Sequence, residues 1–326
     1  MAEYSHLSTI DPEFAAAIAK VPPPPPGPPN VEVSRAMYRD FILPSTKARL
    51  EGSLPSESEL QVKDHQIDVG GGAKVRARSL VPTPKEGEDG WTIGNLEWDD
   101  YPMRKVAVER RIAIVSCEYR LAPEHPFPAS IDDAFAGLKF VASNPGLFSA
   151  SLSKGFLVGG ASAGGNLAAV LSQLARDDPA FKSTPLTGQF LVIPVTVHPD
   201  AYPEEHKSSL LSYEQNKDAP TLTKESMDAF WKWYNPPPTD PKASPLLSPS
   251  KEGLPPAFFQ VAGMDPLRDE GLLYEKLLRQ AGVKTKLEIY PGVPHGFMLI
   301  DPTIKAVRKF EEDFRTGITW LLEVAK

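Results

Sequence analysis

The sequence contains very little cysteine and no long hydrophobic run, and both absences restrict what the protein can be. The single cysteine among 326 residues, Cys117, excludes an intrachain disulfide framework. No stretch approaches the ~18 consecutive apolar residues of a membrane-spanning helix, and the first residues lack the basic-then-apolar pattern of a secretory signal. We therefore expect no membrane span and a cytoplasmic location.

An excess of positive charge is lacking as well. Lys and Arg number 35 against 42 Asp and Glu, which gives a formal net charge of −7. Because nucleic acids and anionic membranes are bound mainly through clustered basic side chains, the composition predicts neither as a partner. A length of 326 residues is normal for one α/β enzyme with a sizeable core, and we expect residues 1–326 to form a single domain.

Proline, in contrast, is abundant, and part of it is concentrated near the N-terminus. Residues 22–26 are all proline and are followed by Pro28 and Pro29. Such a tract favours polyproline II and cannot be helical. It can be a ligand for a proline-reading domain, but a stiff spacer between two helices is favoured. These helices are predicted at 12–19, with Asp11 as N-cap, and at 34–43, so residues 1–50 are expected to form a lid element.

Strand-like and helix-like segments alternate over most of the remaining chain. A hairpin of two alternating strands around a glycine turn is predicted between residues 64 and 81. Strands are then expected at 112–117, 155–158, 190–195, 258–261 and 287–290, and helices at 131–142, 165–176, 267–281 and 303–324. This alternation predicts an α/β fold in which helices flank a mostly parallel sheet that begins with an antiparallel hairpin.

Between residues 202 and 245 the alternation stops, and the segment is rich in Tyr, Trp and Pro. A helix is predicted at 223–233. We expect this insertion to form a second lid element over the carboxyl edge of the sheet, where open α/β sheets bind ligands.

Ser162 lies in a G-x-S-x-G pattern, Gly160-Ala161-Ser162-Ala163-Gly164. By itself the pattern is weak, because a chain of this length contains one by chance about one time in ten. Here it follows a predicted strand and precedes an Ala-rich predicted helix. A sharp strand-to-helix turn tolerates only small neighbours, and it exposes the serine hydroxyl beside a helix N-terminus. Ser162 is therefore the predicted nucleophile, and the alternative is a tight turn without chemistry.

A serine hydroxyl needs a base before it can attack a carbonyl group. Of six histidines, His295 follows the last predicted strand and precedes the last predicted helix, where the base stands when the chain order is Ser, acid, His. Asp265 follows the strand at 258–261, so its carboxylate can hold the imidazole tautomer. Asp269 lies one turn deeper in the next helix and is the alternative acid, interpreted as a surface or ion-pair residue.

Four segments together resemble the hormone-sensitive lipase-type branch of the α/β-hydrolases. They are Tyr119-Arg-Leu-Ala-Pro-Glu-His-Pro-Phe-Pro128, Gly159-Gly-Ala-Ser-Ala-Gly-Gly165, Asp265-Pro-Leu-Arg-Asp269 and His295-Gly-Phe297. The resemblance covers most of the chain from about residue 60 onward. It implies an α/β-hydrolase fold, with Ser162, Asp265 and His295 as the catalytic residues. It also implies hydrolysis of small-molecule, short-chain carboxylic esters through an acyl-enzyme, without a cofactor or a metal.

The resemblance further implies a His-Gly-Gly-Gly motif after a central strand, where its amides form the oxyanion hole with the amide that comes after the nucleophile. This sequence contains no such motif. Residues 81–90 resemble the family segment before that strand, and residues 91–100 resemble the family segment after the motif. The strand and its glycines are therefore expected to be missing between them. The Ala163 amide remains, and the amides of Gly90 and Trp91 are candidates for partial compensation.

Such a gap has consequences for the sheet and for the reaction. A missing inner strand leaves unpaired backbone groups unless the flanking strands close up or another segment fills the slot. Loss of one oxyanion donor costs about 2.7–4 kcal/mol of transition-state stabilisation. We therefore expect a weakened esterase. A catalytically dead hydrolase fold that binds a small molecule is the alternative, and a peptidase on the same fold is a third hypothesis.

Substrate specificity is less readable from the sequence. Four aromatic residues of the insertion, Phe230, Trp231, Trp233 and Tyr234, are candidates to line the substrate pocket. Equally, they can anchor the insertion to the sheet. The sequence carries no signal for an oligomeric state.

Overall fold

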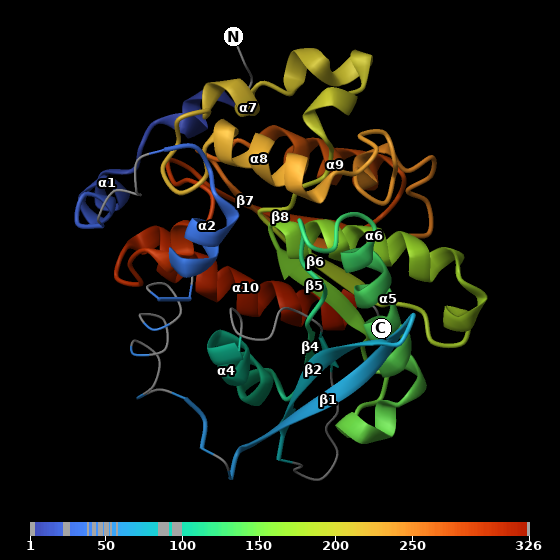
Figure 1. Ribbon diagram of the computed structural model, residues 1–326. Coiled ribbons are helices and arrows are strands. Elements are labelled where there is room, and N and C mark those ends of the chain that lie inside the picture. Colours follow the sequence, from blue (N-terminus) through green and yellow to red (C-terminus); the bar gives the residue numbers. More distant parts are fainter. Residues whose placement is uncertain are drawn as a thin grey trace.

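The order of strands and helices is that of the expected α/β fold (Figure 1). The computed structural model describes residues 4–21, 27–37, 39–40, 44, 48, 52, 54–56, 58–83, 91–92 and 100–324.

Eight strands form two four-stranded sheets in these residues. The first sheet has the order β1-β2-β4-β3, with β1 at Leu60–Gly70, β2 at Ala73–Pro82, β3 at Trp91–Thr92 and β4 at Ala113–Cys117. The second has the order β5-β6-β7-β8, with β5 at Leu157–Ala161, β6 at Gly188–Val192, β7 at Ala257–Ala262 and β8 at Thr285–Tyr290. The hairpin of β1 and β2 is antiparallel, as predicted, and all pairs of the second sheet are parallel.

The short strand β3 stands at the boundary between the two sheets. It pairs in parallel with β4, with Trp91 opposite Ala113 and Thr92 opposite Ile114, and it lies beside β5. The segment at Trp91–Thr92 therefore stands between β4 and β5, and the loss of a family strand from this place stays a prediction. Among the described residues, no ladder of hydrogen bonds joins the two sheets across this slot.

Two parallel strands and one helix differ from the prediction. The strand expected at 155–158 is β5, which starts later and runs up to the residue before Ser162. The strand expected at 190–195 ends at Val192, because Ile193 has a φ of 40°, outside the extended region. Helix α4 (Asp100–Arg110) has no counterpart in the prediction, because charged residues interrupt its apolar positions.

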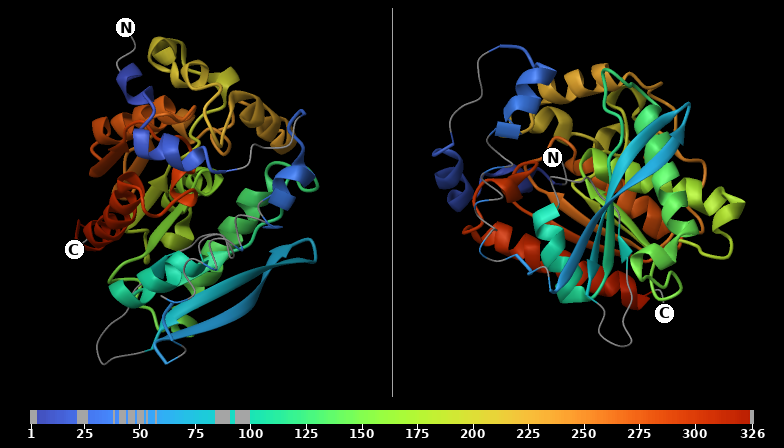
Figure 2. Two further views of the ribbon diagram at one scale, coloured as in Figure 1. Left: turned by 90° about the vertical axis from the view of Figure 1, so that its left-hand side faces the viewer. Right: turned by 60° about the horizontal axis from the view of Figure 1, so that its bottom comes forward.

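Helices cover both faces of the sheets, and each face buries an apolar core (Figures 1 and 2). On one face lie α5 (Ala129–Ser143), α6 (Ala163–Asp177) and α9 (Arg268–Gln280), and on the other lie α4 and α10 (Lys305–Val324). Strand β7 supplies both cores, because successive side chains of a strand point to opposite faces. Phe258 enters one core and Phe259 the other, and both are fully buried.

The N-terminal residues form two short helices. In α1 (Pro12–Ile18), the Asp11 carboxylate accepts the N–H of Phe14 at 2.9 Å, which confirms the predicted N-cap. Helix α2 (Val31–Met37) begins earlier than predicted, because the Asn30 side chain accepts the first free N–H groups. The proline tract at 22–26 and residues 41–43 of the predicted second helix lie outside the described residues.

The insertion lies at the end of the molecule opposite the hairpin of β1 and β2 (Figures 1 and 2). It contains α7 (Ser212–Gln215) and α8 (Lys224–Tyr234), and α8 confirms the helix predicted at 223–233. The described residues also form short 3₁₀ turns at Ser5–Ser8, Pro145–Phe148, Pro179–Phe181, Pro199–Ala201, Glu204–Ser209, Pro245–Leu247 and Phe297–Leu299.

Candidate active site

Ser162 stands at a sharp turn between β5 and α6. Its φ of 56° and ψ of −115° are rare for a residue with a side chain. Two backbone hydrogen bonds hold the turn: Ser162 N donates to Val192 O at 2.9 Å, and Asn166 N donates to Ser162 O at 3.0 Å. A Cβ added at Gly160 would lie 2.6 Å from the carbonyl carbon of Gly164, so this position admits only glycine without a backbone shift.

The side chains of Ser162, His295 and Asp265 form a continuous hydrogen-bonded row. His295 Nε2 lies 2.9 Å from Ser162 Oγ, and His295 Nδ1 lies 2.7 Å from Asp265 Oδ2. Asp265 follows β7 and His295 follows β8, so both stand at the carboxyl edge at which β5 presents the serine. The structure thus brings together the three residues that the sequence predicts as a catalytic set.

The environment of Asp265 determines what this row can do. Its side chain is almost fully buried, and its second oxygen, Oδ1, accepts the N–H of Leu267 at 2.8 Å. An ionised carboxylate only accepts hydrogen bonds, so Nδ1 of His295 must carry the proton that the two groups share. The lone pair of Nε2 then faces the hydroxyl of Ser162, which is the arrangement needed to take up the hydroxyl proton.

The rival acid, Asp269, has a different role. It forms an ion pair with Arg268 at 2.7 Å and accepts the N–H groups of Leu211 at 2.8 Å and Ser212 at 2.7 Å. The interpretation as an ion-pair residue is confirmed, but a surface position is wrong, because Asp269 is only 4% exposed. Its two backbone contacts fasten the insertion to the first turn of α9, directly after the loop that carries Asp265.

Two of the other histidines are engaged elsewhere. His65 lies 2.9 Å from Ser79 Oγ in the hairpin. The ring of His198 packs at a tilt against Trp231, and its Nδ1 accepts the N–H of Asp200 at 3.1 Å. Burial lowers the pKa of both imidazoles from the usual 6.5, so both tend to be neutral at neutral pH.

Residues 89–299 match the family described as alpha/beta hydrolase fold. The chain belongs to the α/β-hydrolase family. This match covers more than half of the hydrolase and includes Ser162, Asp265 and His295. The predicted fold class, a mostly parallel sheet flanked by helices, is thereby confirmed.

Known proteins resemble this hydrolase over nearly its whole length. The AB hydrolase superfamily protein B1A11.02 of Schizosaccharomyces pombe is 36% identical over 98% of this chain and 96% of its own. Carboxylesterase NlhH of Mycobacterium tuberculosis is 36% identical over 82% of both chains. The crystal structure of vibralactone cyclase superposes with a TM-score of 0.95 and 42% sequence identity. The match covers 98% of this chain and 97% of the cyclase chain. The hydrolase is thus related to carboxylesterases, and its enzyme class is that of a carboxylesterase-type serine hydrolase.

The oxyanion side of the site is only partly described. Ala163 is the first residue of α6, so its N–H has no acceptor within the helix and is free to bind an anion beside Ser162. Gly90 lies outside the described residues. Trp91 belongs to β3, between β4 and β5, but its side chain is not described. The participation of Gly90 and Trp91 in an oxyanion hole stays a prediction.

The four aromatic residues of α8 have different surroundings. Trp231 is buried in a small core of the insertion together with Met227, and the ring of Tyr234 packs edge-to-face with Phe127 of the loop before α5. These contacts match the alternative role, that of anchors. Phe230 is 39% exposed and packs edge-to-face with Trp233. Binding of substrate by any of the four, Phe230, Trp231, Trp233 and Tyr234, stays a prediction.

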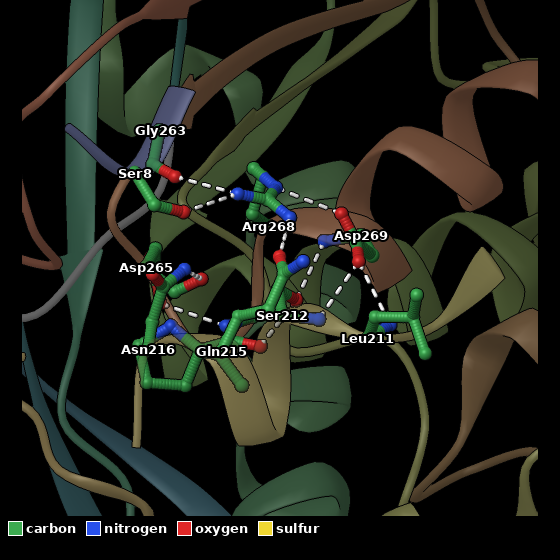
Figure 3. A network of polar contacts seen from close by, with 11 residues as sticks. Ser8, Leu211, Ser212, Gln215, Asn216, Gly263, Asp265, Arg268 and Asp269 are labelled. Atoms are coloured by element: carbon green, nitrogen blue, oxygen red, sulfur yellow. Dashed lines mark hydrogen bonds and ion pairs between the residues drawn. The ribbon is translucent and has the colours of Figure 1, made fainter. Parts of the chain in front are cut away.

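Sequence reasoning misses the polar network around α7, which Figure 3 shows. The guanidinium of Arg268 donates to Ser8 Oγ, Gly263 O and Gln215 Oε1 at 2.7–3.0 Å. It therefore joins the N-terminal segment, the β7–α9 loop and the insertion. A buried charge of this kind has no local sequence signal, because its partners come from distant parts of the chain.

The described part of the hydrolase contains no group of three or more His, Cys, Asp or Glu side chains that could hold a metal ion. None of its helices is long and apolar enough to cross a membrane.

Proposed function

We propose that this hydrolase cleaves short-chain carboxylic esters through an acyl-enzyme on Ser162. The observation that carries the proposal is the row from Ser162 Oγ to His295 Nε2 at 2.9 Å and from His295 Nδ1 to Asp265 Oδ2 at 2.7 Å. The similarity of the chain to carboxylesterase NlhH supports an ester as the substrate. A small-molecule ester is therefore the proposed partner.

The reaction follows from the positions of these atoms. Ser162 Oγ forms a bond with the ester carbonyl carbon while its proton moves to His295 Nε2, and the carbonyl oxygen becomes an oxyanion. Asp265 stabilises the imidazolium, which then gives the proton to the departing alkoxide. The acyl group stays on Ser162 until a water molecule, deprotonated by His295, attacks the same carbon. The bond from that carbon to Ser162 Oγ then breaks, the imidazolium returns its proton to Oγ, and the carboxylic acid leaves.

We infer that weak stabilisation of the oxyanion limits the activity of this protein. The N–H of Ala163 is positioned by the turn that positions Ser162. The sequence contains no His-Gly-Gly-Gly motif to supply further donors. The alignment with the fission-yeast relative spans 332 positions, more than the 326 residues of this chain, so the relative carries residues that have no counterpart here. Loss of one oxyanion donor lowers kcat by about 10²–10³-fold.

The test is hydrolysis of p-nitrophenyl acetate and butyrate by the full chain, with Ser162→Ala as the control. We expect slow release of p-nitrophenol that Ser162→Ala abolishes. A serine-reactive phosphonate should add to the wild-type chain and not to the variant. If the wild type neither turns over esters nor reacts with the phosphonate, the esterase proposal is wrong. Saturable binding of esters without turnover would then favour the dead hydrolase fold that acts as a binding protein.

A second candidate is transfer of the acyl group to a hydroxyl of the substrate itself. It is favoured by the similarity to vibralactone cyclase, with a TM-score of 0.95, because a lactone is a cyclic ester. The chemistry on Ser162 would be unchanged up to the acyl-enzyme, after which an internal hydroxyl replaces water. Mass spectrometry of the product from a hydroxy-acyl ester separates the two, since hydrolysis adds the elements of water to the acyl part and ring closure does not.

A further inference from the structure

We propose that Asn216 and Thr221, both in the insertion, are positioning residues that hold the main-chain carbonyls of Asp265 and His295. The inference rests on the proposed esterase function, because it assigns these two residues to the alignment of its acid and its base. It gives the insertion a role beyond that of a cover over the substrate.

Asn216 follows α7 and is only 4% exposed. Its Nδ2 donates to the carbonyl oxygen of Asp265 at 2.9 Å (Figure 3). That oxygen also accepts the N–H of Arg268 at 3.1 Å, so both of its lone pairs are used. The contact with Arg268 is local to the β7–α9 loop, whereas Asn216 reaches the loop from the insertion. Its amide therefore ties the peptide plane after Asp265 to a separate part of the chain.

Thr221 reaches the loop of the base in a similar way. Its hydroxyl faces the carbonyl oxygens of Pro220 and His295 and donates its single proton to this pair of acceptors. The hydroxyl is brought there by an unusual turn, in which Leu222 N donates to Pro220 O at 3.0 Å around Thr221 with a φ of 73°. This γ-turn is rare and strained, and a β-branched residue is poorly suited to it.

Strained backbone of this kind persists only where the surrounding structure holds it. Leu222 is buried beside the turn, and the Asp269 carboxylate fastens α7 to the first turn of α9, directly after the loop of Asp265. The turn at Thr221 therefore keeps its hydroxyl at the carbonyl of His295. The six residues from Asn216 to Thr221 thus contact both loops that carry the acid and the base.

The consequence for catalysis is geometric. Asp265 and His295 follow different strands, and the hydrogen bond between them spans 30 residues of sequence. The two loops must keep their relative position for Nδ1 to stay on Oδ2 and for Nε2 to stay on Ser162. A misplacement of about 1 Å at such a site can cost ~100-fold in rate.

The experiment compares Asn216→Asp, Thr221→Val and Thr221→Ser with the wild type in full kinetics on p-nitrophenyl butyrate. An ionised Asp at 216 keeps the size of Asn but cannot donate to the Asp265 carbonyl, and Val at 221 removes the hydroxyl. We expect kcat to fall about tenfold in the first two variants while KM changes by less than about twofold, as for an interaction that acts in the transition state. Thr221→Ser should restore most of the rate.

A double-mutant cycle tests whether Asn216 acts through the acid. In an Asp265→Asn background the orienting carboxylate is gone, so Asn216→Asp should have little further effect on kcat. Thr223→Val is the matched control for Thr221→Val: it removes a hydroxyl whose hydrogen bonds are to Ser226, at the start of α8. It should lower Tm and leave kcat unchanged.

Unchanged kcat in both Asn216→Asp and Thr221→Val, with an active wild type, would overturn the inference and leave the esterase proposal intact. So would additive effects in the cycle, or an equal loss of kcat in Thr223→Val, since these indicate general loosening of the insertion. An inactive wild type that does not react with the phosphonate contradicts the esterase proposal itself, and the inference falls with it.

Discussion

The side chains of Arg268 and Asp269, adjacent in the sequence, form an ion pair at 2.7 Å that is almost completely buried. The same contact occurs on the surface, where Arg176 Nε lies 2.7 Å from Asp177 Oδ1. Both pairs use Nε of the arginine and Oδ1 of the aspartate, but they differ in burial, and the exposed pair adds a second contact from Arg176 Nη2 to Asp177 Oδ2 at 2.8 Å. In the buried pair, the aspartate also accepts backbone N–H groups of the insertion, and these would be left unpaired without it.

Asp269→Ala is therefore expected to be strongly destabilising. Removal of one partner leaves the guanidinium of Arg268 buried without its counter-charge, which costs about 3–5 kcal/mol. Urea denaturation measures the free energy of unfolding. Asp177→Ala is the matched control and should change that free energy by less than about 1 kcal/mol, because its pair is exposed. Similar losses in both variants would mean that burial does not set the energy of this pair.

Glu270 predicts a pH dependence of stability. It is buried, its Oε1 accepts the N–H of Thr196 at 2.6 Å, and its Oε2 has no partner among the described residues. Burial, aided by the nearby charges of Asp265 and Asp269, raises its pKa from 4.5 to about 8, although backbone donors oppose the shift. Between these two values the folded protein holds a proton that the unfolded chain has lost.

The contribution of Glu270 is therefore complete below about pH 4.5 and is lost as the pH rises through about 8. The free energy of unfolding should fall by up to about 1.4 kcal/mol per pH unit in this window. Glu270→Gln keeps an oxygen for Thr196 and removes the titration. In urea denaturation across the window, the difference in stability between variant and wild type should shift in favour of the variant as the pH rises. A constant difference would contradict the assignment.

The backbone of Ser162 predicts a conflict between stability and activity. Its φ of 56° with ψ of −115° costs a residue with a Cβ on the order of 1–3 kcal/mol, a cost that glycine avoids. Ser162→Gly and Ser162→Ala both lose the hydroxyl and should both be inactive toward esters. Of the two variants, Ser162→Gly should be more stable by about 1 kcal/mol in thermal or urea unfolding. The gain is smaller than the full backbone strain, because glycine also gives the unfolded chain more conformational entropy. Equal stability would mean that the turn is not strained.

Gly160 and Gly164 provide a matched pair in the turn around Ser162. A Cβ at Gly160 would lie 2.6 Å from the backbone of Gly164, whereas a Cβ at Gly164 would meet no heavy atom of the described residues within 4 Å beyond its chain neighbours and the nearby backbone of α6. Gly160→Ala should therefore shift the turn, slow the reaction with the phosphonate, and cost about 1–3 kcal/mol of stability. Gly164→Ala lies in α6 and should raise stability by up to about 1 kcal/mol, because alanine favours a helix. Differential scanning calorimetry and labelling kinetics measure both effects. If Gly160→Ala reacts with the phosphonate at the same rate as the wild type, there is no tight steric limit at position 160.

Much of the fold was readable from local patterns. The hairpin of β1 and β2 follows from alternation around glycines, and the N-cap of α1 follows from Asp11 before Pro12. The strand ends were less readable. Ile193 ends β6 through its φ of 40°, although its side chain is as apolar as those of the strand. Helix α4 escaped prediction because its apolar residues are interrupted by charges.

By itself, the sequence determined which three residues we predicted to meet at the candidate site. Ser162, Asp265 and His295 each stand at the end of a strand-like run, and the carboxyl ends of parallel strands meet at one edge, so their meeting followed from chain order alone. Only the tertiary structure decided what holds them there. Asn216 and Thr221 contact carbonyl groups 49 and 74 residues away, and Asp269 is buried by the same insertion. The physical reason is that such contacts use backbone atoms, which every residue carries. Their partners are therefore set by how the insertion folds back over the sheet, and residue type gives no sign of them.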